Sequence, residues 1–419
     1  MDSGPRRNIY SAIEALHQMK RVIRLFYAFQ FFFSMLLWLP IFYEYQKTIG
    51  LTDIEIFSIQ SIYYFVFCLF EIPTGMAADR FGHRRCLVWG SGILVLSNLI
   101  PVFFQSYSGF LIHFVSIALS RSLISGASSA YIYDYLQKSG AVEVYKKIEG
   151  NARAYSLFGK VVFWAGVGPL MQWHMTLPYW LTAACSLVAV YMAMSLPPVQ
   201  EIANQRVGPR FSSAEMVRRV REVWGRLLAT PFLIFLMIQG VAIFVLARIA
   251  QVNLFQPILS SKQFDLTTFG MIMSLMTVFE GIGSMRPDLF KKVMNDFNAI
   301  YFLTIVMAVS LMLIPICSKA GVLAALCIFS LATGFSFPIQ RQLMNDAIPD
   351  SKYRATLLSV ESIVDRAANA ILALFIGSFL AGGRLNAFLY LTGGVSVLLT
   401  LSLIVVGVSP RFSRSGRNS

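Results

Sequence analysis

Residues Glu71 to Arg85 read Glu-Ile-Pro-Thr-Gly-Met-Ala-Ala-Asp-Arg-Phe-Gly-His-Arg-Arg, a charged stretch between two long apolar runs. The flanking runs, residues 54–77 and 86–105, each meet the length of about 20 residues that a helix needs to cross a bilayer. Only a few residues are left to reverse the chain, and we expect Gly75 and Gly82 to allow that tight turn. The stretch therefore predicts two membrane-spanning helices joined by a short charged hairpin.

The composition of the whole chain indicates the same class of protein. Of the 419 residues, 56% are hydrophobic and 13% are charged, and the mean hydropathy is +0.64. A soluble protein of this composition would leave a large apolar area facing water. Residues 2–24 are polar and lead directly into a long apolar run, so we expect an N-terminus that is retained rather than cleaved as a signal peptide.

Twelve apolar runs along the chain are suited to transmembrane helices. They lie near residues 22–43, 54–77, 86–105, 109–133, 152–173, 177–196, 231–256, 267–286, 298–316, 320–340, 356–381 and 385–408. The sequence thus predicts an all-α membrane protein with twelve transmembrane helices.

One long polar insertion divides these runs six and six. The division predicts an N-terminal six-helix bundle at residues 1–196, a cytoplasmic linker with an amphipathic helix at residues 197–230, and a C-terminal six-helix bundle at residues 231–419. Gly126 followed by Asp134 parallels Gly334 followed by Gln342, a spacing expected of two pseudo-symmetric repeats.

The positive charges give the orientation. Assigning both tails and the even-numbered gaps to one side places 27 of the 35 Lys and Arg residues there, while the other side receives Lys47, Lys262, Lys319 and Arg384. By the positive-inside rule both termini are cytoplasmic, and we expect the plasma (inner) membrane. Because the charges are spread over short segments between spans, nucleic-acid binding is not expected.

The hairpin carries a recognisable motif. Gly75, Asp79, Arg80, Gly82 and Arg84 match a pattern that resembles the loop between helices 2 and 3 of the major facilitator superfamily of secondary transporters. The resemblance implies the major facilitator fold of two six-helix bundles.

The same resemblance implies a conformational gate on the cytoplasmic side. His83 stands where the family usually has a second arginine, and Asp134, at the cytoplasmic end of span four, fits the acid that the loop should pair with. Because a histidine side chain can change charge within the physiological range, we expect this gate to respond to pH. Arg84 or Arg85 could supply a permanent charge instead.

Two further stretches resemble bacterial drug/metabolite-proton antiporters of that superfamily. Arg121 and Gly126 fit its Arg-x-x-x-x-Gly motif on span four, where the arginine is tied to proton coupling. Gly168-Pro169 is similar to the core of the antiporters' glycine-rich motif, although Trp164 and Gln172-Trp173 depart from it.

Charged side chains within the predicted spans are the candidates for binding. A charge near the bilayer centre costs at least about 2.5 kcal/mol, so such a residue usually faces a watery cavity or a paired acid. Glu361 and Asp365 are one helical turn apart, and we expect one of them to titrate. Counted from the helix starts, Arg248 lies nearer the outside, while these two acids lie between the inner surface and the middle. The predicted substrate-binding and proton-binding residues are Arg121, Lys160, Arg248, Glu280, Glu361 and Asp365; for each, structural pairing is the alternative.

Motifs for catalysis, metals and cofactors are absent from the sequence. The four histidines and five cysteines show no metal-ligand spacing, and there is no Gly-x-x-x-x-Gly-Lys phosphate loop. We therefore expect neither an enzyme nor a cofactor.

The predicted function is secondary active transport by alternating access, with proton-coupled export of a small organic molecule. The surplus of cations within the spans favours an anionic substrate, such as a carboxylate or a siderophore-like molecule. The alternatives are a proton-linked importer of a small organic anion and a transport-inactive receptor or scaffold, against which the charges within the spans argue. The expected partners are the small-molecule substrate, protons and the lipid bilayer, with the protein acting as a monomer.

Overall fold

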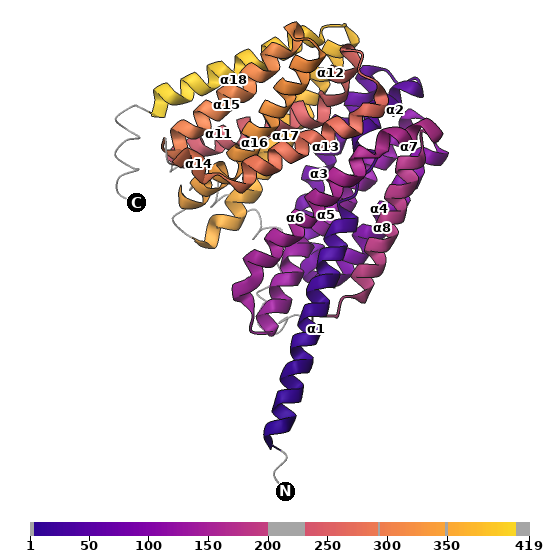
Figure 1. Ribbon diagram of the computed structural model, residues 1–419, viewed down its shortest axis with the longest axis vertical. Helices are drawn as coiled ribbons and strands as arrows, with labels where there is room; N and C mark the ends of the chain where they lie inside the picture. The colour runs from indigo at the N-terminus through magenta and orange to yellow at the C-terminus, as the bar shows by residue number, and fades with distance from the viewer. Residues whose placement is uncertain (1–3, 200–230, 292–293, 348–350, 408–419) are drawn as a thin grey trace. The chain divides into compact units, whose positions relative to one another are not determined.

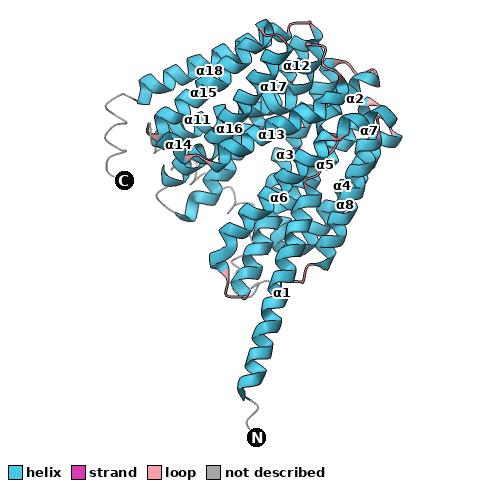
Figure 2. Cartoon of the chain, viewed as in Figure 1, coloured by secondary structure: helices cyan, strands magenta, loops and turns pink. Residues whose placement is uncertain are grey.

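The computed structural model describes residues 4–199, 231–291, 294–347 and 351–407. Within these ranges every regular element is a helix, which confirms the all-α prediction (Figure 2). The amphipathic helix predicted in the linker falls on residues 200–230 and so lies outside the described residues.

Ten helices in the described part of the chain are long and apolar enough to cross a membrane. An eleventh span results if residues 142–165 are joined to α7 (Val167–Trp173), with which they make a bend of 43°. The first predicted span, residues 22–43, is not one continuous helix. Instead, α1 (Gly4–Phe33) ends at Phe33, and the chain continues through η1 (Leu39–Ile41) into α2 (Phe42–Thr48).

Side chains from other helices stabilise this break after α1. Trp164 donates its indole N–H to the carbonyl oxygen of Leu36 at 2.9 Å, and the Thr182 hydroxyl accepts the backbone N–H of Leu37 at 3.0 Å. Backbone polar groups within a membrane protein need such internal partners, because lipid offers none. The pattern of apolar residues in the sequence does not show which side chains form these hydrogen bonds, so it could not predict the break in the helix.

The quoted hairpin is tighter than predicted. Helix α3 (Asp53–Phe81) and helix α4 (His83–Phe103) are separated by Gly82 alone, whose φ of 94° is in the left-handed region that favours glycine. The prediction for Gly75 was wrong, because this residue lies within α3 and not in the turn.

The chain forms two compact units, and the first contains the described parts of residues 1–39 and 66–206. Besides α1, the end of α3, α4 and α7, it holds α5 (Tyr107–Lys138), η2 (Val142–Val144), α6 (Tyr145–Ala165) and α8 (Leu177–Ser195). Helix α4 packs against α5 and α8, and α1 packs against α6 and α8 (Figure 1). Phe26, Phe29, Leu87 and Tyr131 are fully or almost fully buried in its core.

The second unit contains the described parts of residues 40–65 and 207–419. Its larger helices are α11 (Pro231–Arg248), α13 (Phe269–Met285), α15 (Asp296–Leu313), α16 (Lys319–Ala347), α17 (Ser351–Ala381) and α18 (Leu385–Gly407). Shorter elements are η3 (Ile249–Asn253), α12 (Phe255–Ser261), η4 (Leu266–Thr268), α14 (Asp288–Lys291) and η5 (Ile314–Ile316). Helix α16 packs against α11, α13 and α15, while α17 packs against α11 and α18. The division predicted at residues 197–230 stays a prediction.

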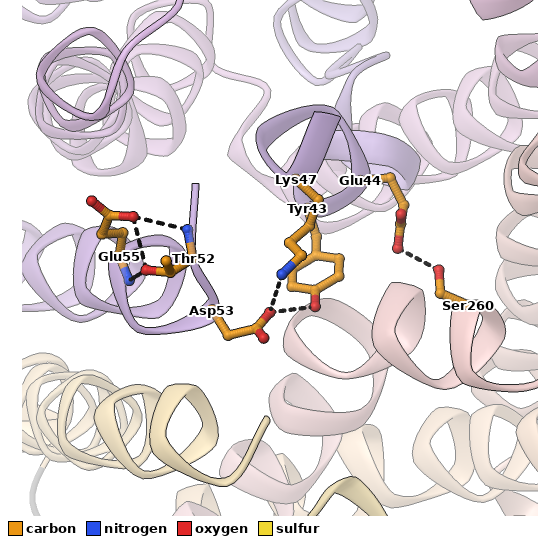
Figure 3. Close-up of polar contacts among 7 residues, drawn as sticks. All are labelled: Tyr43, Glu44, Lys47, Thr52, Asp53, Glu55 and Ser260. Carbon is orange, nitrogen blue, oxygen red and sulfur yellow. Dashed lines mark hydrogen bonds and ion pairs between the residues drawn. The ribbon is translucent and has the colours of Figure 1, made fainter. Parts of the chain in front are cut away.

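Polar bonds hold α2 within this second unit. The side-chain oxygen of Gln256 on α12 accepts the backbone N–H groups of Tyr43 and Glu44, at 2.9 Å and 3.2 Å, and so caps the start of α2. Figure 3 shows the side-chain bonds around it: Ser260 bonds Glu44, and Tyr43 donates to Asp53 at 2.6 Å. The segment of residues 40–65 is therefore tied to α12 by specific hydrogen bonds.

Candidate functional site

The candidate site lies in the second unit and is built on a π-helical turn. Helix α11 ends at Arg248 and continues as η3, a π-helix over Ile249–Asn253. A π turn inserts one extra residue per turn, shifts the following side chains out of α-helical register, and often occurs at functional sites. Arg248, Gln251 and Asn253 extend from this stretch.

Arg248 and Asp365 form an ion pair between α11 and α17. Nη2 of Arg248 lies 2.9 Å from Oδ2 of Asp365, and Nδ2 of Asn369 donates to Oδ1 of the same carboxylate at 3.0 Å. Asp365 is 5% exposed. The guanidinium also lies over the Tyr64 ring, 5.7 Å from its centroid. Both carboxylate oxygens of Asp365 are thus bonded, one to a cation and one to an amide.

The same cluster retains unused hydrogen-bonding capacity. The Arg248 side chain is 33% exposed, in contrast to 7% for its partner. Within the described residues, Nε of Arg248, Nδ2 of Asn253 and Oδ1 of Asn369 have no hydrogen-bond partner. A guanidinium whose Nε–H has no partner keeps the capacity for a further charge-assisted hydrogen bond to a carboxylate. The arrangement can therefore accept an anion beside Asp365.

Gln251 connects this cluster to α13 and α16. Its Nε2 donates to Oε2 of Glu280 at 3.2 Å and to the Ser330 hydroxyl at 3.5 Å. Gln251, Asn253, Ser330 and Asn369 were not predicted as site residues, because the search of the sequence followed charge and these side chains are neutral. The sequence did contain one signal for Asn369: it follows Asp365 by four residues, a spacing that places the two side chains on the same face of a helix.

Glu361 does not share a partner with Asp365. Its Oε2 lies 3.2 Å from Nη1 of Arg341 on α16, a residue that the sequence had assigned to the cytoplasmic loops. The predicted separation in depth between Arg248 and Asp365 was also wrong. Nη2 of Arg248 and Oδ2 of Asp365 lie 2.9 Å apart, so the two side chains meet at one level of the unit.

The two predicted cations of the first unit contact aromatic rings. The guanidinium of Arg121 lies 5.9 Å from the centroid of the Phe33 ring, and Nζ of Lys160 lies 5.8 Å from that of Trp164. Both side chains are half-buried. The six predicted residues therefore divide between the units, with Arg248, Glu280, Glu361 and Asp365 together in the second.

Two of the predicted gate residues, His83 and Asp134, are in contact. Nε2 of His83 lies 3.3 Å from Oδ2 of Asp134, whereas Arg84 donates to the carbonyl oxygen of Met194 at 2.5 Å. Arg80 is exposed and lies over the Phe81 ring. The Asp79 side chain lies outside the described part.

Carboxylates, imidazoles and thiols do not gather into a metal site in the part of the chain that the structure describes. No group of three or more His, Cys, Asp or Glu side chains there could hold a metal ion. The chemistry available at the cluster is instead ion pairing, hydrogen bonding and proton transfer.

Comparison with curated proteins finds a relative that matches part of the chain. A curated relative, the probable galactarate/D-glucarate transporter GudP of Escherichia coli (strain K12), is 27% identical over 132 residues, which cover 31% of this chain and 28% of the relative. The chain thus spans well under half the length of that relative.

Three solved structures have a similar fold. The nucleoside transporter NupG, in a mutant form, gives a TM-score of 0.76 at 15% identity, covering 92% of this chain and 99% of that chain. The D-xylose-proton symporter gives 0.69 at 13% identity, with 93% and 97% covered. The peptide transporter POT in complex with alafosfalin gives 0.71 at 16% identity, with 94% of each covered.

A family pattern extends over most of the chain. Residues 24–371 match the Major Facilitator Superfamily, a span that includes the charged hairpin, the π-helical turn and the Arg248–Asp365 pair. With this match, the helical fold and the similar transporters, the chain belongs to the Major Facilitator Superfamily and is a multi-pass membrane transporter, not an enzyme.

Proposed function

We propose that the protein is a proton-coupled transporter of a small organic anion that carries a carboxylate and hydroxyl groups, working by alternating access. The sequence favours export, because Arg121 and Gly126 fit a motif of proton antiporters. Proton-linked import of the same anion is the alternative direction, and a transport-inactive receptor is the alternative class.

The observation that supports this proposal best is the Arg248–Asp365 pair. A substrate carboxylate that approaches the Arg248 guanidinium also approaches Asp365, and two carboxylates that close repel each other. A proton taken up by a nearby acid would offset this repulsion. Anion binding and proton binding are therefore expected to favour each other at this site.

Hydroxyl groups of the substrate would meet the neutral side chains of the cluster. Asn369 offers an amide beside Asp365, and Gln251 and Asn253 offer amides on the π turn that follows Arg248. The name of the curated relative adds support, because galactarate and D-glucarate are hydroxylated dicarboxylates.

We also propose that both termini are cytoplasmic, that the protein resides in the inner membrane and that it acts as a monomer. The excess of Lys and Arg on one side of the predicted spans supports the orientation. Reporter fusions at the hairpin Gly82 and at the loop near Gly383 would test it, since these positions should report opposite sides.

The test of transport uses purified protein reconstituted in vesicles. Counterflow of labelled hydroxylated mono- and dicarboxylates, sugars and amines is measured with and without an imposed proton gradient. We expect counterflow of hydroxylated carboxylates, with accumulation that depends on the gradient and reports the direction of coupling by its sign.

Two variants make the test specific. Arg248→Gln should lose at least about tenfold in counterflow, the effect of removing one charge-assisted contact. Arg384→Gln removes an exposed cation of the same unit and should leave counterflow unchanged. Equal activity of wild type and Arg248→Gln would contradict the proposed site, and no counterflow of any compound would contradict the function.

A further inference from the structure

We infer that Glu361 is the proton-binding residue, with Gln340 as the hydrogen-bond acceptor for its protonated form and Arg341 as the partner of its ionised form. Its role in coupling rests on the proposed transport function. The assignment of the protonation site itself does not.

Glu361 and Gln340 are deeply buried and incompletely bonded. Glu361 is 2% exposed; its Oε2 meets Arg341 at 3.2 Å, and its Oε1 has no partner among the described residues. Gln340 on α16 is fully buried, and its Nε2 donates to the carbonyl oxygen of Leu236 at 2.9 Å. Its Oε1 also has no partner within the same part of the chain. Two buried acceptors therefore lack a donor.

A glycine brings these two side chains to the same point. A Cβ atom on Gly240 of α11 would lie 2.6 Å from Oε1 of Glu361 and 2.6 Å from Nε2 of Gln340. The unpartnered carboxylate oxygen and the Gln340 amide are thus near neighbours beside the bare backbone of α11. Any larger residue at position 240 would have to displace them.

A proton on Oε1 of Glu361 supplies the missing donor. The Gln340 atom nearest to this point is Nε2, which is held by its bond to Leu236, while its Oε1 is an acceptor without a donor among the described residues. Leaving a buried polar atom without a partner is costly, and one O–H···O bond would satisfy both orphaned oxygens once the Gln340 side chain turns its oxygen toward Glu361. The proton is taken from water and returned to it, so the step changes only the charge of Glu361.

Asp365 lacks these features. Its oxygens are already bonded to Arg248 and Asn369, so a proton there would weaken the ion pair or compete with the Nδ2 donor of Asn369, although Oδ1 of that amide has no partner among the described residues. The charged groups that act on Glu361 are Arg341 from α16 and Asp365 from its own helix. Arg341 stabilises the ionised form, and Asp365 favours the protonated form.

The position of Glu361 offers a route to coupling. Glu361 and Asp365 are one turn apart on α17, so the proton site and the Arg248 cluster share a helix. Protonation of Glu361 removes the attraction to Arg341, whose side chain is 48% exposed and can turn to water. The negative charge next to the anion site falls at the same time.

Infrared difference spectroscopy on the purified full-length protein tests the site without a substrate. The probe is the C=O stretch of a protonated buried carboxyl group, followed between about pH 5 and 9. We expect one such band in the wild type and its loss in Glu361→Gln. The band should remain in Asp365→Asn and Glu280→Gln, which replace other acids of the same unit.

Two further variants should move the band in opposite directions. Gln340→Met removes the acceptor and should lower the midpoint pH of the band by about one unit, the effect of one hydrogen bond. Arg341→Gln removes the partner of the ionised form and should raise the midpoint. If these residues acted only in packing, the two variants would not shift the midpoint pH in opposite directions.

Transport assays then distinguish a wrong proton site from a wrong transport function. Glu361→Gln should retain counterflow but lose accumulation driven by the proton gradient. A band that survives in Glu361→Gln, or that disappears in Asp365→Asn, would overturn the assignment even if the wild type transports. A wild type that transports nothing would refute the proposed function, while the infrared result would still decide the proton site.

Discussion

Nε2 of His83 lies 3.3 Å from Oδ2 of Asp134, while the adjacent Arg84 donates to the backbone of Met194 instead. An ionisable imidazole, not a permanently charged guanidinium, therefore faces the acid at the end of α5. A histidine side chain ordinarily changes charge within the physiological pH range. The contact makes this end of the first unit a candidate for pH-dependent opening.

His83→Arg should flatten the pH dependence of labelling at a cysteine introduced at Ser139, an exposed position just after α5. In the wild type an imidazole contacts Asp134, whereas an arginine at this position keeps its charge at every pH, so only the wild type should change its labelling as the pH is varied. Arg85→Gln alters the charge of the same hairpin and should keep the wild-type profile. Identical profiles in the wild type and His83→Arg would leave His83 as an ordinary hairpin residue.

Asp365→Leu should destabilise the second unit, because it leaves the Arg248 guanidinium without its ion pair. We expect a loss of about 1–3 kcal/mol, less than for a fully buried pair because one third of the Arg248 side chain is exposed. Thermal unfolding in detergent measures the effect. The double variant Arg248→Leu with Asp365→Leu should recover most of the stability, and failure to recover would mean that the pair is not the cause.

Gly283→Ala should reduce the stability of the α13–α16 contact by about 1–3 kcal/mol, as overpacking does. A Cβ at this position would lie 2.5 Å from the carbonyl oxygen of Leu331, a backbone atom that cannot move alone. Gly281→Ala, two residues away on α13, is the matched control, because a Cβ there meets nothing within 4 Å. Melting temperatures of the purified variants compare the two, and equal values would contradict the packing argument.

Burial raises the pKa of Glu44 on α2 above its ordinary value, although the bond from Ser260 and the charge of Lys47 oppose this shift. A carboxyl group whose pKa is raised in the folded state stabilises the fold at low pH, and this contribution is lost as pH rises through the raised pKa. Glu44→Gln should therefore be more stable than the wild type at neutral pH, with a difference that shrinks as the medium is acidified below the ordinary pKa of glutamate. Melting temperature against pH measures it, and a difference that grows on acidification would show the opposite shift.

Much of the fold could be predicted from local sequence features. The apolar runs reach the length of a bilayer crossing, and each helix satisfies its own backbone hydrogen bonds, so length and hydropathy were enough to place most helices. The sequence offered both Gly75 and Gly82 for the hairpin turn, and only Gly82, with its positive φ, lies in it. The pairing of His83 with Asp134 was predictable from the resemblance of the hairpin motif.

The partners of the charged residues could not be predicted in the same way. The sequence identified Arg248, Glu361 and Asp365 as candidates because charge within an apolar run is unusual. Which of them meet depends on how α11, α16 and α17 pack and on the extra residue in the π turn, and hydropathy carries no information on either. Gln251, Asn253 and Asn369 were missed because they are neutral, and a search for charge within apolar runs passes over them.

The sequence by itself determined that this chain crosses a membrane many times, where its hairpin turns and which of its charges are costly in lipid, because each of these properties depends on residues adjacent in the chain. Only the tertiary structure decided that Asp365 is fully bonded while Glu361, one turn away, keeps an unpartnered oxygen beside Gln340. The reason is that hydrogen-bond satisfaction depends on neighbours from other helices. Two acids on one helix thus acquire different chemistry from the side chains that α11 and α16 bring to them.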